Sequence, residues 1–108
     1  MNYNIQTIPF FDKQTKKLAK KHKSLKQDLK TLIESLEIEP TQGVRLTENV
    51  YKIRLAIKSK GKGKSGGARV ITHFKIIKDT VYLLSIYDKS DTDNISDNDI
   101  IELLKQIN

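Results

Sequence analysis

The most regular alternation of apolar and polar residues in this sequence runs from Tyr51 to Lys58. Apolar side chains occupy every second position: Tyr51, Ile53, Leu55 and Ile57. The alternate positions, which would point to the other face, include three cations: Lys52, Arg54 and Lys58. Because successive side chains of a strand point to opposite faces, this pattern predicts a strand with one buried face and one positively charged face.

Helical spacing of apolar residues precedes this strand in two segments. Residues 10–22 carry a thin apolar stripe, and leucine or isoleucine recurs at helical spacing from Leu25 to Leu36. Ser24 stands where a helix cap is expected, and Pro40 and Gly43 close the region. The short turn between the segments predicts a helical hairpin that packs its leucine face on a sheet.

Further strands and one more helix complete the expected fold. The other predicted strands cover Tyr3–Ile8, Val44–Leu46, Arg69–Ile77 and Val81–Asp88. Ser96 and Asp99 form a capping-box pattern that begins a last helix. We therefore expect an α+β fold: an N-terminal strand, an α-helical hairpin packed on an antiparallel β-sheet meander, and a short C-terminal helix.

Length and composition restrict the class of protein. The 108 residues favour one domain over 1–108. The absence of cysteine excludes disulfides and thiolate chemistry and suits a reducing compartment. No apolar run reaches the length of a membrane span. We therefore expect a cytoplasmic protein with no membrane partner.

The distribution of charge points to an anionic partner. Net charge is +7, and residues 1–87 hold 18 Lys and Arg against 7 Asp and Glu. Eight lysines lie between Lys13 and Lys30, where only Asp28 offsets them. A basic body of this kind favours nucleic acid or an acidic protein segment, although lysine-rich helix faces also serve solubility alone. Both interpretations of the helical lysines stay open.

A segment rich in lysine and glycine follows the central strand, and we call residues 58–67 the cationic loop. Gly61 to Gly66 matches the dinucleotide-binding pattern G-x-G-x-x-G, but a strand follows where a helix is required. A phosphate-binding P-loop fails too, because Lys58 stands in place of its first glycine. We therefore expect a mobile hairpin loop whose lysines bind phosphates: Lys58, Lys60, Lys62 and Lys64.

Few other residues indicate chemistry. The two histidines, His22 and His73, are too few for a convincing metal site. His73 shares a strand face with Arg69, which would let it take part in proton transfer beside the cations. The acidic residues near the C-terminus do not fit a calcium loop, and we expect them to lie in a solvated loop and at a helix N-terminus: Asp88, Asp91, Asp93, Asp97 and Asp99.

Three stretches together resemble the RelE/ParE superfamily of type II toxin–antitoxin toxins, and its RelE/HigB-like branch most closely. They are Val50–Leu55, Gly66–Ile71 and Leu83–Lys89. The resemblance covers nearly the whole chain. It implies a toxin that cleaves mRNA on the translating ribosome without a metal or other cofactor, and that is held inactive by a cognate antitoxin protein.

The resemblance also implies roles for individual residues. Lys52 and Arg54 match paired basic residues of the family's central strand, and Arg69 matches the arginine that stabilises charge on the phosphate. Lys89 lies near a basic residue that acts as an acid or a phosphate clamp. Because Arg54 stands where the family's base is a lysine and a guanidinium stays protonated, either Lys52 or His73 would be the base.

Two further alternatives stay open at the level of sequence. Ile95 falls near the position of an expected tyrosine, so Tyr87 either stacks on an RNA base or packs within the sheet. The ParE-like members of the superfamily inhibit DNA gyrase without cleaving RNA, and such a non-nuclease toxin is the alternative function. A plain RNA-binding module is a third.

Overall fold

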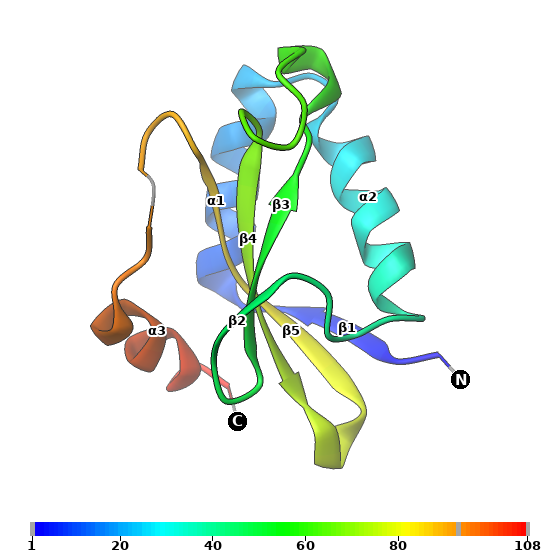
Figure 1. Cartoon of the computed structure of the whole chain (residues 1–108), viewed down its shortest axis with the longest axis vertical. Helices are drawn as coiled ribbons and strands as arrows, with labels where there is room; N and C mark the ends of the chain where they lie inside the picture. The colour runs from blue at the N-terminus through cyan, green and yellow to red at the C-terminus, as the bar shows by residue number, and fades with distance from the viewer. Residues whose placement is uncertain (1, 93, 108) are drawn as a thin grey trace.

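The computed structural model describes residues 2–92 and 94–107, and its elements follow the expected α+β order. Helices and strands are β1 (Asn4–Thr7), α1 (Pro9–Lys21), α2 (Leu25–Leu36), β2 (Val44–Thr47), β3 (Val50–Leu55), β4 (Ala68–Lys75), β5 (Thr80–Asp88) and α3 (Asp97–Leu104) (Figure 1). Two 3-10 turns, η1 (Lys58–Lys60) and η2 (Ile76–Lys78), lie in the connections around β4. The predicted fold class is confirmed.

The five strands form one sheet in the order β1-β5-β4-β3-β2. Strands β2 to β5 pair antiparallel in succession, which is the expected meander. The N-terminal strand β1 joins the far side of this meander, parallel to β5. Its pairing makes β5 an interior strand, and all nine residues of β5 are buried. Buried and exposed residues therefore do not alternate along β5, because both of its faces are covered.

The two long helices form the predicted hairpin. Pro9 stands at the first position of α1, where its missing N–H costs no hydrogen bond. In α2 the leucines at helical spacing are buried: Leu25, Leu29, Leu32 and Leu36. Burying one such side chain stabilises the fold by about 1.5–3 kcal/mol. The leucine face therefore fixes α2 against the sheet, as expected.

The helix caps follow the sequence prediction at one helix and depart from it at another. Ser96 caps α3, and its hydroxyl accepts a hydrogen bond from the Asp99 N–H at 3.1 Å. Ser24 precedes α2, but its hydroxyl donates to the Asp28 carboxylate at 2.7 Å and accepts from the Ser59 N–H at 2.8 Å, so it caps no N–H of α2. The predicted Ser24 cap is therefore wrong, because a buried carboxylate is the stronger partner for its hydroxyl.

None of the three helices that the structure describes has the length and apolar character that a bilayer-spanning segment needs.

Candidate functional site

Strand pairing places three of the predicted site residues on one face of the sheet. Arg54 on β3 pairs directly with Arg69 on β4, and Lys52 pairs with Ile71 one step along the same face. Residues directly opposite in neighbouring strands point to the same side of a sheet. Lys52, Arg54 and Arg69 therefore share one surface.

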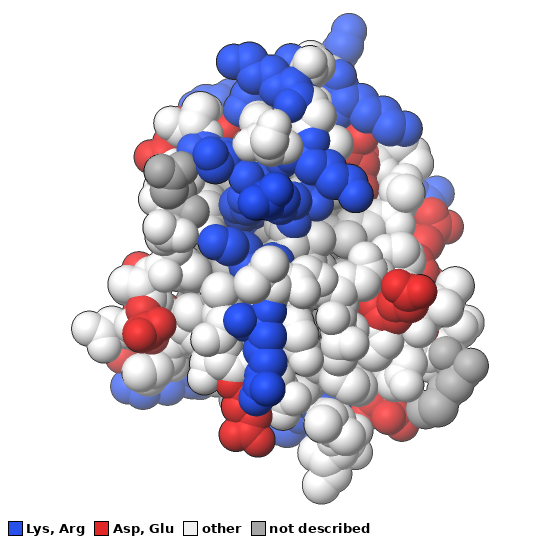
Figure 2. All heavy atoms as spheres, in the orientation of Figure 1, with Lys and Arg blue, Asp and Glu red and all other residues white. Residues whose placement is uncertain are grey.

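A cavity of about 350 Å³ joins these residues to the end of β5. It is lined by Val44, Lys52, Arg54, Arg69, Lys89 and Asn94. The lining holds four cations and no carboxylate, and Asn94 accepts a hydrogen bond from the Lys52 ammonium at 3.4 Å. Figure 2 shows lysine and arginine side chains gathered on this side of the molecule. An open cavity of this charge suits a phosphodiester.

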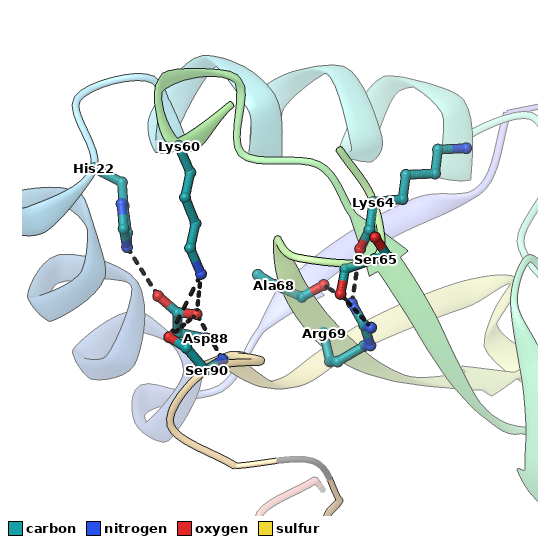
Figure 3. Close-up of polar contacts among 8 residues, drawn as sticks. All are labelled: His22, Lys60, Lys64, Ser65, Ala68, Arg69, Asp88 and Ser90. Carbon is teal, nitrogen blue, oxygen red and sulfur yellow. Dashed lines mark hydrogen bonds and ion pairs between the residues drawn. The ribbon is translucent and has the colours of Figure 1, made fainter. Parts of the chain in front are cut away.

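Arg69 is the most constrained cation of the cavity. The residue is only 4% exposed. The Nη1 group donates to the carbonyl oxygens of Lys64 at 2.9 Å and Ala68 at 3.1 Å, and Nη2 donates to Ser65 at 3.2 Å (Figure 3). These hydrogen bonds fix the plane of the guanidinium. The group has further N–H donors that can bind an anion.

The cationic loop contains a regular turn, and its expected mobility stays a prediction. It begins with η1, which ends at Gly61 in the left-handed conformation with φ of 72°. It ends at Gly67, where any Cβ would overlap the carbonyl oxygen of Leu55. The backbone conformation favours glycine at Gly61 and the close approach of Leu55 requires it at Gly67, so these glycines shape a turn and do more than leave space for phosphate.

The four loop lysines do not share one environment. Lys60 forms an ion pair with Asp88 at 2.6 Å, and its side chain is only 14% exposed, so its ammonium already has an anionic partner within the protein. Lys58 and Lys64 line a second cavity of about 560 Å³ between α2 and β3. Lys62 is exposed. Phosphate binding by the exposed lysines Lys58, Lys62 and Lys64 stays a prediction. Lys60 would have to leave Asp88 before it could bind a phosphate.

His73 lies away from the cavity. It pairs with Val50 at the opposite end of β4, four residues from Arg69, which corresponds to roughly 13 Å along a strand. Its Nδ1 lies 3.1 Å from the Asn49 carbonyl oxygen. Burial lowers the pKa of His73, the hydrogen bond to Asn49 opposes this, and the charge of Lys75 lowers the pKa further. The structure does not bring His73 together with the cations, although the two share a strand face.

Tyr87 is the cross-strand neighbour of Arg69 on β5 and is buried, with 9% of it exposed. It lines a cavity of about 420 Å³ under α3, and this cavity also contains Asn94 and Ile95. Its position agrees with the packing alternative. Stacking on an RNA base stays a prediction, which would require access through this cavity.

Asp88 is the polar residue that sequence reasoning misplaced. We expected a solvated carboxylate, but Asp88 is only 5% exposed. One oxygen accepts hydrogen bonds from Lys60 and from the N–H and hydroxyl of Ser90, at 2.6, 3.0 and 2.7 Å. The other oxygen lies 3.0 Å from Nε2 of His22. Asp93, which we had grouped with it, lies outside the described residues.

These contacts determine the charge of Asp88. Burial raises its pKa, but the hydrogen bonds from Lys60, Ser90 and His22 outweigh burial and hold the pKa well below its usual range. The sequence carried one signal of this role: Asp88 is the last residue of the longest strand, in which every residue is buried. Asn94 carried none, because it lies in a polar connection without periodicity.

Comparison with known proteins decides the family. A model described as the RelE toxin of the RelE/RelB toxin–antitoxin system matches residues 9–107. The chain belongs to the RelE toxin family. This agrees with the resemblance seen in the sequence, and the ParE-like alternative receives no support.

Solved structures of E. coli RelE share the fold. A mutant RelE toxin in the free state is 20% identical, with 100% of both chains covered and a TM-score of 0.66. The isolated RelE toxin is 24% identical over 98% of this chain and 99% of that one, with a TM-score of 0.53. RelE in the intact RelBE complex is 24% identical over 80% of this chain and 95% of that one, with a TM-score of 0.51.

Proposed function

We propose that this RelE-family toxin is a ribosome-dependent endoribonuclease that blocks translation by cleaving mRNA. The observation that carries the proposal is the cavity that holds Lys52, Arg54, Arg69 and Lys89 together. Cations grouped in this way favour binding of a phosphodiester and stabilise the extra negative charge that develops during its cleavage.

The reaction that we propose uses the RNA's own nucleophile. The 2′-oxygen forms a bond to the neighbouring phosphorus, and the bond from phosphorus to the 5′-oxygen breaks. A base takes the proton of the 2′-hydroxyl, and an acid gives a proton to the leaving 5′-oxygen. The products are a 2′,3′-cyclic phosphate and a 5′-hydroxyl, so atoms and charge balance without a co-reactant.

The cavity suggests a division of roles among its residues. Arg69 is already oriented by three carbonyl hydrogen bonds, which favours it as the group that stabilises the phosphate in the transition state. Arg54 lies directly opposite and would clamp a second phosphate oxygen. We assign the base to Lys52, since His73 lies outside the cavity and a guanidinium is a poor base. Lys89 is then the candidate acid or clamp.

The helical hairpin provides a second cationic surface for the ribosome. The eight lysines of α1, α2 and their turn are all exposed: Lys13, Lys16, Lys17, Lys20, Lys21, Lys23, Lys26 and Lys30. Such a surface suits phosphates of ribosomal RNA, and binding through it would weaken as salt concentration rises. Exposed Lys58, Lys62 and Lys64 of the cationic loop would extend it toward the cavity.

We also propose a cognate antitoxin as the partner that keeps the toxin inactive in the cytoplasm. The family is defined by a toxin–antitoxin system, and one similar structure is RelE bound to its RelB antitoxin. A basic surface with exposed apolar residues such as Val44 suits an acidic, amphipathic segment of such a protein.

The experiment that tests this function is inducible expression followed by mapping of transcript ends. Wild type should arrest growth and produce new cuts within translated codons, whereas Arg69→Ala should do neither. Because Arg69 also holds the loop, Arg54→Gln provides a second variant at an exposed position. Lys105→Ala is the matched control, since Lys105 pairs only with Glu102 among the described residues. Growth arrest with intact mRNA and broken DNA would refute the proposal.

A further inference from the structure

Two buried carboxylates fasten the start of the cationic loop to the rest of the molecule. Asp28 in the first turn of α2 accepts a hydrogen bond from the Lys58 N–H at 3.0 Å. Asp88 at the end of β5 accepts one from the Lys60 ammonium at 2.6 Å. Asp28 and Asp88 are each only 5% exposed. Water therefore does not compete strongly for either contact, and η1 is held from two sides.

The other end of the loop is fastened to the cavity. The carbonyl oxygens of Lys64 and Ser65 accept hydrogen bonds from Arg69, and the Gly67 carbonyl oxygen accepts one from the Lys89 N–H at 3.0 Å. Figure 3 shows Lys60 pointing into the Asp88 cluster, and Lys64 and Ser65 beside Arg69. Only four residues separate Lys60 from Ser65. A shift of η1 therefore moves the carbonyls that orient Arg69.

We propose that Asp88 is a positioning residue for RNA cleavage. Through Lys60 it fixes the cationic loop, so that the carbonyls of Lys64 and Ser65 hold the Arg69 guanidinium in the orientation that the scissile phosphate needs. The inference rests on the proposed function of the cavity. It assigns to Asp88 and Lys60 a role that neither the family match nor the sequence pattern gives them.

His22 provides the matched control for this inference. It contacts Asp88 at 3.0 Å, as Lys60 does at 2.6 Å, but it belongs to the turn after α1 and not to the cationic loop. His22→Gln and Lys60→Gln therefore each remove one partner of the same carboxylate. Only the second removes a contact of the cationic loop, which Asp28 still holds through the Lys58 N–H.

Asp88→Asn separates positioning from direct RNA binding by Lys60. It keeps every cation of the protein but weakens the attachment of Lys60. If Lys60 acted by binding phosphate, Asp88→Asn would release the lysine and preserve or increase cleavage, while Lys60→Gln would decrease it. If Asp88 acts as a positioning residue, both variants decrease cleavage, and Lys60→Arg restores most of it.

Two measurements test the proposal on the folded, full-length protein and these variants. The first is the rate of rotation about the Nε–Cζ bond of Arg69, followed by NMR of its guanidinium. The second is cleavage of mRNA on translating ribosomes, separated into kcat and KM for the ribosome. Lys60→Gln and Asp88→Asn should speed the rotation and lower kcat by about tenfold each, as expected for one lost charge-assisted hydrogen bond. KM should stay unchanged, and His22→Gln should match wild type in both measurements.

Three results would overturn the proposal: unchanged Arg69 rotation in both variants, wild-type kcat in Asp88→Asn, or an equal effect of His22→Gln. A wild-type protein that leaves mRNA intact on translating ribosomes would instead contradict the proposed function. The rotation of Arg69 would then decide by itself whether Asp88 positions the guanidinium.

Discussion

Arg54 and Arg69 are direct cross-strand neighbours on β3 and β4, so two guanidinium groups share one surface of the sheet. Like charges placed directly opposite each other in neighbouring strands destabilise a sheet. A bound phosphate would neutralise this repulsion. The pair therefore indicates a surface arranged for binding an anion at some expense of stability in the free protein.

This relationship predicts opposite effects of Arg54→Gln on stability and on activity. Removing one charge of the pair should raise the free energy of unfolding by about 0.2–1 kcal/mol. The same change should decrease mRNA cleavage, because one clamp of the phosphate is lost. Urea unfolding and cleavage on translating ribosomes measure the two effects. A variant that is both less stable and fully active would show that the arginine pair has no binding role.

His73 predicts a pH dependence of stability near neutrality. Its folded-state pKa lies below the ordinary value of 6.5, chiefly because of burial, so the unfolded chain binds a proton more readily. The contribution of neutral His73 to the free energy of unfolding is therefore complete above pH 6.5. It decreases as the pH falls toward the folded-state pKa, by at most about 1.4 kcal/mol per pH unit for one proton. Urea unfolding between pH 7.5 and 5 should show a shallower loss in His73→Gln than in wild type. Identical slopes in the two proteins would count against a buried, neutral His73.

Asp88 predicts a second pH dependence, in the acid range. Its folded-state pKa lies below the ordinary value of 3.8, so it contributes stability above that pH and loses the contribution as the pH falls toward the folded-state pKa. At neutral pH, Asp88→Asn should lower the free energy of unfolding by about 1–3 kcal/mol. The difference from wild type should shrink in urea titrations below pH 3.8. A difference that stays constant with pH would mean that the charge of Asp88 is not what stabilises the fold.

Gly67 predicts a steric requirement at the end of the cationic loop. A Cβ at this position would overlap the Leu55 carbonyl oxygen, and backbone atoms cannot move aside cheaply. Gly67→Ala should therefore destabilise the protein by about 1–3 kcal/mol in thermal unfolding. Ser65→Ala, two residues earlier and exposed, is the control and should change stability little. Equal stability of the two variants would contradict the close approach of the loop to β3.

Local pattern was sufficient to predict most of the fold. The alternation from Tyr51 to Ile57 identified β3, and the leucine spacing identified α2, because each signal depends only on which face an element buries. The Ser96 cap was equally local, since it is separated from its partner Asp99 by two residues. The parallel pairing of β1 with β5 could not be predicted this way, because it joins segments at opposite ends of the chain.

The site was less predictable for the same physical reason. Alternation placed Lys52 and Arg54 on one face, but their proximity to Arg69 depends on the register between β3 and β4. The contacts of Asp88 are also distant in sequence, 66 residues from His22 and 28 from Lys60. No periodicity in the sequence distinguishes such a buried carboxylate from a solvated one. His73 shows the converse: a shared strand face does not bring two residues together along the strand.

The most direct measurement of the central claim is the single-turnover rate of mRNA cleavage by purified protein on translating ribosomes. Wild type and Lys105→Ala should both cleave mRNA and leave 2′,3′-cyclic phosphate and 5′-hydroxyl ends. For a folded Arg69→Ala protein the account predicts a rate about 10²–10³-fold lower. A folded Arg69→Ala protein that cleaves at the wild-type rate would contradict it.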